Sequence, residues 1–128
     1  MKVLLVEDSE SMRLQVFQCL NALGHEVIEA EDGIDGLAKL ESTTGIDLVL
    51  CDVNMPGMGG LAFVDEAKKR GSEIPIIMLT TRSELSNIRK ARDAGAKAWI
   101  IKPFRSDLLV IALNKVAHGK SSTMLLAL

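Results

Sequence analysis

Short runs of Val, Ile and Leu recur along the chain, and longer segments with helical spacing separate them. Four of the runs show no polar alternation, which is typical of strands buried on both faces of a parallel sheet. The run at 27–30 alternates with charged residues instead, which predicts an edge or near-edge position. The five runs are 3–6, 27–30, 48–51, 76–79 and 98–101.

The segments between the runs predict five helices. Their apolar residues recur every three or four positions, and a glycine such as Gly24 or Gly95 follows most of them as a C-terminal stop. This alternation predicts an α/β fold of the (βα)5 type, a doubly wound five-stranded parallel sheet in a three-layer α/β/α arrangement. The predicted helices cover 10–23, 34–42, 60–70, 84–94 and 106–118.

The length of 128 residues and the apolar content of 48% indicate one globular domain. A net charge of −2 and few aromatic residues give no reason to expect nucleic acid. We find no secretory pattern and no apolar stretch of about 18 residues, so we expect a cytoplasmic protein without membrane insertion. Residues 120–128 are too short for a second domain and are expected to extend the last helix or fray.

Polar side chains follow four of the five runs. Glu7 and Asp8 follow the first run, Asp52 the third, Thr80 the fourth and Lys102 the fifth. In open parallel sheets, ligands bind outside the carboxyl ends of the strands. We therefore expect these five side chains to gather at one rim of the sheet.

The predicted cluster needs a counter-charge. Two unit charges about 4 Å apart repel by roughly 4 kcal/mol at an effective dielectric constant of about 20. Lys102 and one divalent cation would balance the three carboxylates. Mg²⁺ suits them best because it prefers oxygen ligands and binds through one or two carboxylates plus a phosphate, whereas His25 and His118 lie too far along the chain to predict a zinc site.

These residue types also suit phosphoryl transfer. Asp52 stands alone at a central strand end and is the best candidate nucleophile toward phosphorus. Lys102 and the cation can neutralise the phosphoryl oxygens, and Thr80 can donate a hydrogen bond to one of them. The candidate catalytic residues are therefore Asp52, Thr80 and Lys102.

Four segments together, in this order and spacing, match a known family. The chain resembles the receiver domain of two-component response regulators, most closely the single-domain CheY-like chemotaxis regulators, which have a flavodoxin-like fold. The resemblance implies a receiver domain over residues 1–119. The matching segments are Leu5-Val6-Glu7-Asp8, Asp52-Val53-Asn54-Met55-Pro56-Gly57-Met58-Gly59-Gly60, Leu79-Thr80-Thr81 and Ile101-Lys102-Pro103-Phe104.

The resemblance implies a role for each matching residue. Asp52 would be the acceptor that becomes 4-aspartylphosphate. Glu7, Asp8, Asp52 and the backbone carbonyl of Asn54 would bind Mg²⁺, with Mn²⁺ as a substitute. Thr80 and Lys102 would sense the phosphoryl group. Trp99 would be the switch aromatic that acts with Thr80, at a position where the family usually has Tyr or Phe.

The resemblance also implies a signalling switch. The phosphoryl group would come from the phosphohistidine of a histidine kinase or histidine phosphotransfer protein. The surface formed by the fourth helix, fifth strand and fifth helix would then change conformation and control a downstream protein, in chemotaxis, motility or a phosphorelay. A phosphatase is a further partner, and the chain would be a monomer or weak homodimer. It would not be an enzyme beyond its own phosphorylation and dephosphorylation.

Three other interpretations remain open. The chain can be a receiver domain cut from a larger transcriptional regulator or hybrid kinase. An aspartyl phosphohydrolase usually has a second acid two residues after the nucleophile, where this chain has Asn54. A flavodoxin-like cofactor module needs a phosphate loop rich in Ser, Thr and Gly after the first strand, where this chain has the acidic segment Glu7-Asp8-Ser9-Glu10.

The last predicted helix carries a second apolar stripe at Val110, Leu113 and Ala117. We expect the opposite side of the helix, with Leu108 and Ala112, to pack on the sheet. The second stripe, together with Trp99, is then predicted to be a partner or dimer surface. The alternative is that Met124, Leu125 and Leu126 of the tail cover it.

Overall fold

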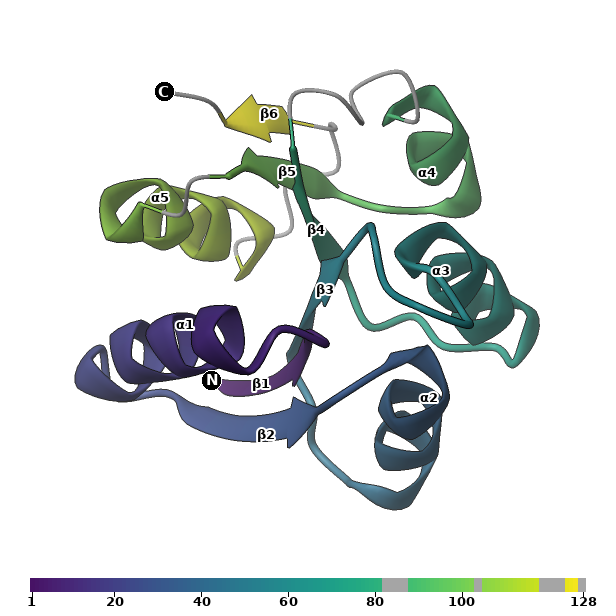
Figure 1. Cartoon of the computed structure of the whole chain (residues 1–128), viewed down its shortest axis with the longest axis horizontal. Coiled ribbons are helices and arrows are strands. Elements are labelled where there is room, and N and C mark those ends of the chain that lie inside the picture. The colour runs from purple at the N-terminus through teal and green to yellow at the C-terminus, as the bar shows by residue number, and fades with distance from the viewer. Residues whose placement is uncertain (82–87, 103–104, 118–123, 127–128) are drawn as a thin grey trace.

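The computed structural model describes residues 1–81, 88–102, 105–117 and 124–126. Its parallel sheet contains the five predicted strands, and the structure arranges them in the order β2-β1-β3-β4-β5 (Figure 1). All their pairings are parallel. The strands are β1 (Lys2–Val6), β2 (Glu26–Ala30), β3 (Leu48–Asp52), β4 (Ile76–Thr80) and β5 (Ala98–Ile101).

Helices cover both faces of this sheet and complete the expected three layers. The helices α1 and α5 lie on one face, and α2, α3 and α4 lie on the other (Figure 1). Residues 84–87, predicted to begin the fourth helix, lie outside the described part of the chain. The helices are α1 (Glu10–Ala22), α2 (Gly33–Ser42), α3 (Gly60–Lys69), α4 (Ile88–Ala94) and α5 (Ser106–Ala117).

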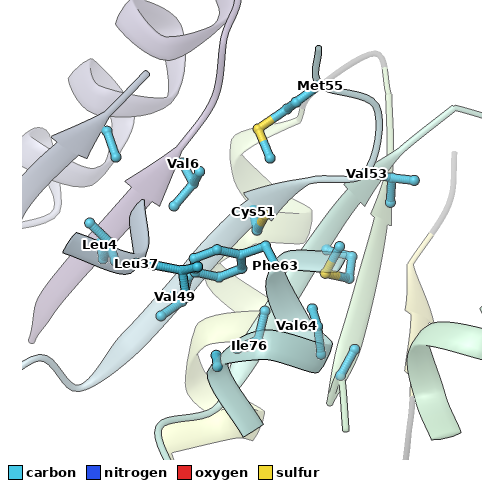
Figure 2. Close-up of a cluster of buried hydrophobic side chains, with 14 of the residues drawn as sticks. Leu4, Val6, Leu37, Val49, Cys51, Val53, Met55, Phe63, Val64 and Ile76 are labelled. Carbon is cyan, nitrogen blue, oxygen red and sulfur yellow. The ribbon is translucent and has the colours of Figure 1, made fainter. Parts of the chain in front are cut away.

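The sheet separates two apolar cores. On the side of α2 and α3, the Phe63 ring projects from α3 among Val6, Leu37 and Val49 (Figure 2). A Cβ at Gly36 would lie 3.0 Å from this ring and 2.9 Å from Val6, so the close approach of α2 requires glycine there. On the other side, α1 and α5 cover a second cluster. Its members include Val3, Leu5, Val16, Leu20, Leu50, Ile77, Ile100 and Leu109.

The strand β2 lies at an edge of the sheet, as its alternating sequence predicts. Glu26 and Glu29 are exposed on it, whereas the four strands β1, β3, β4 and β5 are buried almost throughout. Charged side chains on an edge strand discourage pairing with another chain.

A sixth strand, β6 (Met124–Leu126), pairs in parallel with β5. The sequence analysis expected the tail to extend the last helix or fray, and for these three residues the structure shows a strand instead. The pairing makes β5 an interior strand of a sheet ordered β2-β1-β3-β4-β5-β6. The other tail residues, 120–123 and 127–128, lie outside the described residues.

The stripe predicted as a partner surface on α5 is contradicted at Leu113, whereas Val110 is half-buried and the side chain of Ala117 lies outside the described part of the chain. Leu113 is 2% exposed and belongs to the core with Leu109, Ala112 and Val116, which follow the i, i+3, i+4, i+7 spacing of a helix face. Trp99, predicted to join this stripe, is fully buried in the core on the other face of the sheet. The sheet-facing side of α5 is therefore broader than expected and includes part of the supposed second stripe.

Candidate functional site

The carboxyl ends of β1 and β3 bring three acidic side chains together. Asp52 is the last residue of β3, and Glu7 directly follows β1, whose Val6 is in register with Cys51. Glu7, Asp8 and Asp52 each offer an oxygen within 4.8 Å of the other two. The parallel register thus joins residues 45 positions apart, as expected from the strand ends.

Lys102, just beyond β5, reaches into this acidic cluster. Its Nζ donates a hydrogen bond to Oδ1 of Asp52 at 2.7 Å and lies 3.5 Å from Oε1 of Glu7. Glu7 is fully buried and Asp52 is 2% exposed, whereas Asp8 is exposed. The site is therefore open to solvent at Asp8 and closed at its base.

The electrostatics of the site follow from this burial. Burial, and then the charge of Asp52, raise the pKa of Glu7 from 4.5 to about 8. Burial alone would lower the pKa of Lys102, but its hydrogen bond to Asp52 and the charge of Glu7 raise it above the ordinary value. One ammonium group therefore does not compensate the buried carboxylates fully.

The donor set fits a hard divalent cation. Glu7 Oε1 is buried and has no hydrogen-bond partner among the described residues, although the Lys102 ammonium lies nearby. A buried carboxylate oxygen without a hydrogen bond is costly, and a divalent cation bound to it would offset that cost. Oxygen donors without histidine or cysteine favour Mg²⁺ or Mn²⁺ over zinc. Glu7, Asp8 and Asp52 are the residues that would hold such an ion.

The turn between β1 and α1 is supported by Arg13, which the sequence analysis did not identify. Its Nη1 donates to the carbonyl oxygen of Glu7 at 2.7 Å, and its Nε lies 3.6 Å from Oε1 of Glu29 on β2. Ser9 caps α1, and its backbone N–H donates to Oε2 of Glu7. The sequence signal that could have identified Arg13 is its position one turn into the helix that follows the acidic pair Glu7-Asp8.

Gly60 is a second residue that the sequence analysis did not single out for the site. A Cβ at this position would lie 2.2 Å from the carbonyl oxygen of Asp52. The Gly60 N–H donates to the carbonyl oxygen of Val53 at 2.8 Å, so the start of α3 packs directly on the backbone after Asp52. A consecutive glycine pair before a helical segment was the sequence signal.

Thr80 and Lys102 are joined by their backbones across the ends of β4 and β5. The N–H of Lys102 donates to the carbonyl oxygen of Thr80 at 2.7 Å. The Thr80 side chain is fully buried, and its Oγ1 donates to the carbonyl oxygen of Thr81 at 3.2 Å. The structure therefore places Thr80 at the predicted rim, with its hydroxyl bonded locally.

Trp99 lies fully inside the core between the sheet and the helices α2 to α4. Trp99 is in register with Met78, so its side chain is on the same face as Met78 and Thr80. Its indole Nε1 is buried and has no hydrogen-bond partner within the described segments. The core thus accommodates the whole indole of Trp99, and its Nε1 has no hydrogen bond among the described residues.

Other predicted site residues are less informative. Asn54 is exposed in the loop after β3, two residues beyond Asp52. Pro103 and Phe104, which complete the last matching segment, lie outside the described residues, as does His118. Cys51 is buried, and burial raises the pKa of its thiol well above the ordinary value.

Comparisons with known proteins agree with this geometry. The response regulator receiver domain family matches residues 3–114. The chain is 40% identical to chemotaxis protein CheY1 of Helicobacter pylori strain J99, over 91% of this chain and 96% of that protein. It is 37% identical to a CheY homologue of Campylobacter jejuni strain 81-176, over 91% and 92% of the two chains.

Solved structures lead to the same class. Chemotaxis protein CheY4 of Vibrio cholerae superposes with a TM-score of 0.84 at 38% identity, over 90% of this chain and 97% of that one. A response regulator receiver domain protein of Clostridium thermocellum superposes with a TM-score of 0.86 at 30% identity, over 93% and 95%. The protein belongs to the response regulator receiver domain family and has the CheY-like form of the fold.

Receiver domains of this kind act as signalling switches and generally use Mg²⁺, which agrees with the donor set at Glu7, Asp8 and Asp52. Among the described helices, none is long and apolar enough to cross a membrane.

Proposed function

We propose that this protein is a phosphoacceptor switch in which Asp52 accepts a phosphoryl group from a phosphohistidine. The observation that carries the proposal is the contact between Lys102 Nζ and Asp52 Oδ1 beside the buried carboxylate of Glu7. A carboxylate paired with an ammonium at the carboxyl ends of the strands is a suitable nucleophile for phosphorus. The donor is the phosphohistidine of a histidine kinase or a histidine phosphotransfer protein.

The transfer forms a bond between an Asp52 oxygen and phosphorus and breaks the nitrogen–phosphorus bond of the donor, whose imidazole leaves and regains a proton. Lys102 stabilises the charge on the transferring oxygens, and Thr80 can turn its hydroxyl from the Thr81 carbonyl toward the new group. A bound Mg²⁺, held by Glu7, Asp8, Asp52 and the carbonyl of Asn54, would supply further charge neutralisation. The chain therefore catalyses only its own phosphorylation and dephosphorylation.

Phosphorylation would change the site from one negative charge on Asp52 to about two, with three acceptor oxygens. Lys102 is the residue after β5, and its backbone is bonded to Thr80, so movement of this pair is transmitted to β5 and Trp99. The surface formed by α4, β5 and α5 is the proposed output surface. The downstream protein is of the chemotaxis or motility type, or the next member of a phosphorelay, and a phosphatase would reset the switch.

The test uses Mg²⁺ with acetyl phosphate, or with beryllofluoride as a mimic of the phosphoryl group. We expect a mass gain of one phosphoryl group and a change in Trp99 fluorescence. Asp52→Asn should abolish both, whereas Asp65→Asn, a change at an exposed aspartate of α3, should leave both intact. Stoichiometric phosphorylation of Asp52→Asn would overturn the assignment.

The phosphohydrolase interpretation predicts a different result. Multiple turnovers of a phosphomonoester by the wild-type protein would favour it, and a single phosphorylation of each chain would exclude it. Asn54 stands where such an enzyme has its second acid. Its amide cannot act as a general acid, which supports the switch over the hydrolase.

A further inference from the structure

The outer edge of β5 is occupied by the chain's own C-terminal strand. Ala98, Trp99 and Ile100 are in register with Met124, Leu125 and Leu126, and the pairing is parallel. Figure 1 shows β6 beside β5, on the side away from β4. The helix α5 lies on the same face of the sheet as α1, so the connection from β5 to β6 has the opposite hand to the four right-handed βαβ units before it.

The two edges of the five-stranded core differ in chemistry. The edge strand β2 exposes Glu26 and Glu29, which protect it from pairing with another chain. The segment β5 is Ala-Trp-Ile-Ile and has no charged residue. An apolar strand of this kind, if left at an edge, offers free backbone N–H and C=O groups to any extended segment. The β5 edge is thus a surface on which an extended segment can dock, and β6 of the same chain occupies it.

The attachment of β6 is short. It contains three residues, whereas the other edge pairing, of β1 with β2, joins five residues of each strand. Short terminal strands belong to the parts of a fold that open at the lowest free-energy cost. The strand β6 can therefore detach while the rest of the sheet remains folded.

The strand β5 also connects this edge to the phosphorylation site. Ile100, which pairs with Leu126, lies two residues before Lys102, and Lys102 contacts both Asp52 and the backbone of Thr80. In this structure β6 is docked while Lys102 is paired with Asp52. A rearrangement of Lys102 and Thr80 would shift the end of β5 and alter the geometry that β6 needs.

We propose that Met124–Leu126 is a detachable strand that occupies the outer edge of β5 in cis, and that phosphorylation of Asp52 favours its release. Release opens the β5 edge and the adjoining face for the downstream protein. This inference rests on the proposed function for its trigger. The docking of β6 on β5 does not depend on it.

Thermodynamic linkage makes the proposal testable without the downstream protein. If the phosphorylated state favours release, then release must strengthen phosphoryl-mimic binding by the same factor. Leu125→Pro removes a backbone donor and disfavours the docked strand. Leu128→Pro, the same substitution beyond β6, is the matched control. Both are made in the full-length chain, and far-UV circular dichroism checks that each variant is folded.

Amide hydrogen exchange and beryllofluoride titration with Mg²⁺ are the two measurements. We expect Leu125→Pro to speed exchange in segment 98–101 and to tighten beryllofluoride binding by about fivefold or more. We expect Leu128→Pro to match the wild type in both. Unchanged exchange in Leu125→Pro would show that β6 does not dock. Faster exchange with unchanged beryllofluoride affinity would show that docking is not coupled to the site.

A failure of the underlying function gives a separate result. If the wild-type chain takes up no phosphoryl group from acetyl phosphate and does not bind beryllofluoride, then the proposed function and the trigger both fail. The exchange measurement still decides whether β6 covers β5. If the wild-type chain is phosphorylated but Leu125→Pro binds beryllofluoride with the wild-type affinity, then this inference is overturned and the proposed function stands.

Discussion

Lys102 and Asp52 form the central ion pair of the site, with 2.7 Å between Nζ and Oδ1. The pair joins the ends of β3 and β5, which are separated in the sheet by β4. Lys102 also lies 3.5 Å from Glu7 at the end of β1. One ammonium group therefore holds together the strand ends that define the site, and its position explains the first two predictions.

Replacing Lys102 by Met should destabilise the metal-free protein because it leaves the buried Asp52 carboxylate, and Glu7 when it is ionised, without their cation. The loss in the free energy of unfolding should be about 3 kcal/mol near pH 8, and smaller near pH 6, where Glu7 can keep its proton. Chemical denaturation with a chelator present measures both. Lys97→Met is the control: Lys97 precedes β5 and its charge lowers the pKa of Lys68, so its loss should not destabilise. Equal losses in the two variants would contradict the prediction.

The stability of the metal-free protein should fall as pH rises from about 4.5 to about 8. Over this range the folded protein holds a proton on Glu7, because its pKa is raised to about 8, whereas the unfolded chain releases it near 4.5. A folded state that binds more protons loses stability with rising pH. Glu7→Gln should remove this slope, and saturating Mg²⁺ should reduce it in the wild type. Denaturation at a series of pH values decides it, and an unchanged slope in Glu7→Gln would refute the assignment.

Arg13→Met should weaken Mg²⁺ binding because Arg13 holds the carbonyl oxygen of Glu7. Residues that orient metal ligands typically change affinity by about tenfold or more when they are removed. Titration of Mg²⁺ followed by Trp99 fluorescence or calorimetry gives the affinity. Arg70→Met breaks an exposed ion pair with Glu41 on the other side of the molecule and should leave the affinity unchanged. If both arginine variants bind Mg²⁺ like the wild type, Arg13 has no positioning role.

Gly60→Ala should destabilise the protein by about 1 to 3 kcal/mol, the usual cost of forcing an atom into a packed region. The added Cβ would lie 2.2 Å from the Asp52 carbonyl oxygen, so the backbone after Asp52 must move. Gly59→Ala is a close control, since its Cβ would meet nothing nearer than the Val53 carbonyl oxygen at 3.5 Å. Thermal unfolding and the rate of phosphorylation by acetyl phosphate are the readouts. A Gly60→Ala variant that matches Gly59→Ala in both would show that the close approach is not needed.

The strand and helix pattern could be predicted from the sequence because it depends on local periodicity. The uniformly apolar runs predicted buried parallel strands, and the alternation at 27–30 predicted the edge position of β2. The polar residues at the strand ends predicted the cluster of Glu7, Asp8, Asp52 and Lys102, since parallel strands end at a common rim. The structure confirms the predicted fourth helix over residues 88–94, although its predicted beginning lies outside the described residues.

The features that the sequence analysis predicted wrongly or missed depend on contacts between segments far apart in the chain. The α5 face was assigned from spacing alone, yet Leu113 packs on the sheet because the apolar arc of the helix is wider than one stripe. The pairing of Met124–Leu126 with β5 could not be predicted, because three apolar residues in a tail are compatible with a helix, a strand or disorder until a free edge lies beside them. Gly60 and Arg13 acquire their roles only through contacts with the backbone of Asp52 and Glu7.

By itself, the sequence determined the alternation of strands and helices, the location of the candidate site at the strand ends, and the chemical type of its residues. Only the tertiary structure decided the burial of Glu7 and the pKa that follows from it, the contact of Lys102 with both carboxylates, and the partner of the C-terminal strand. The physical reason is distance along the chain. Periodicity and residue type act within a few positions, whereas desolvation, ion pairing and edge pairing depend on segments that the fold brings together from far apart.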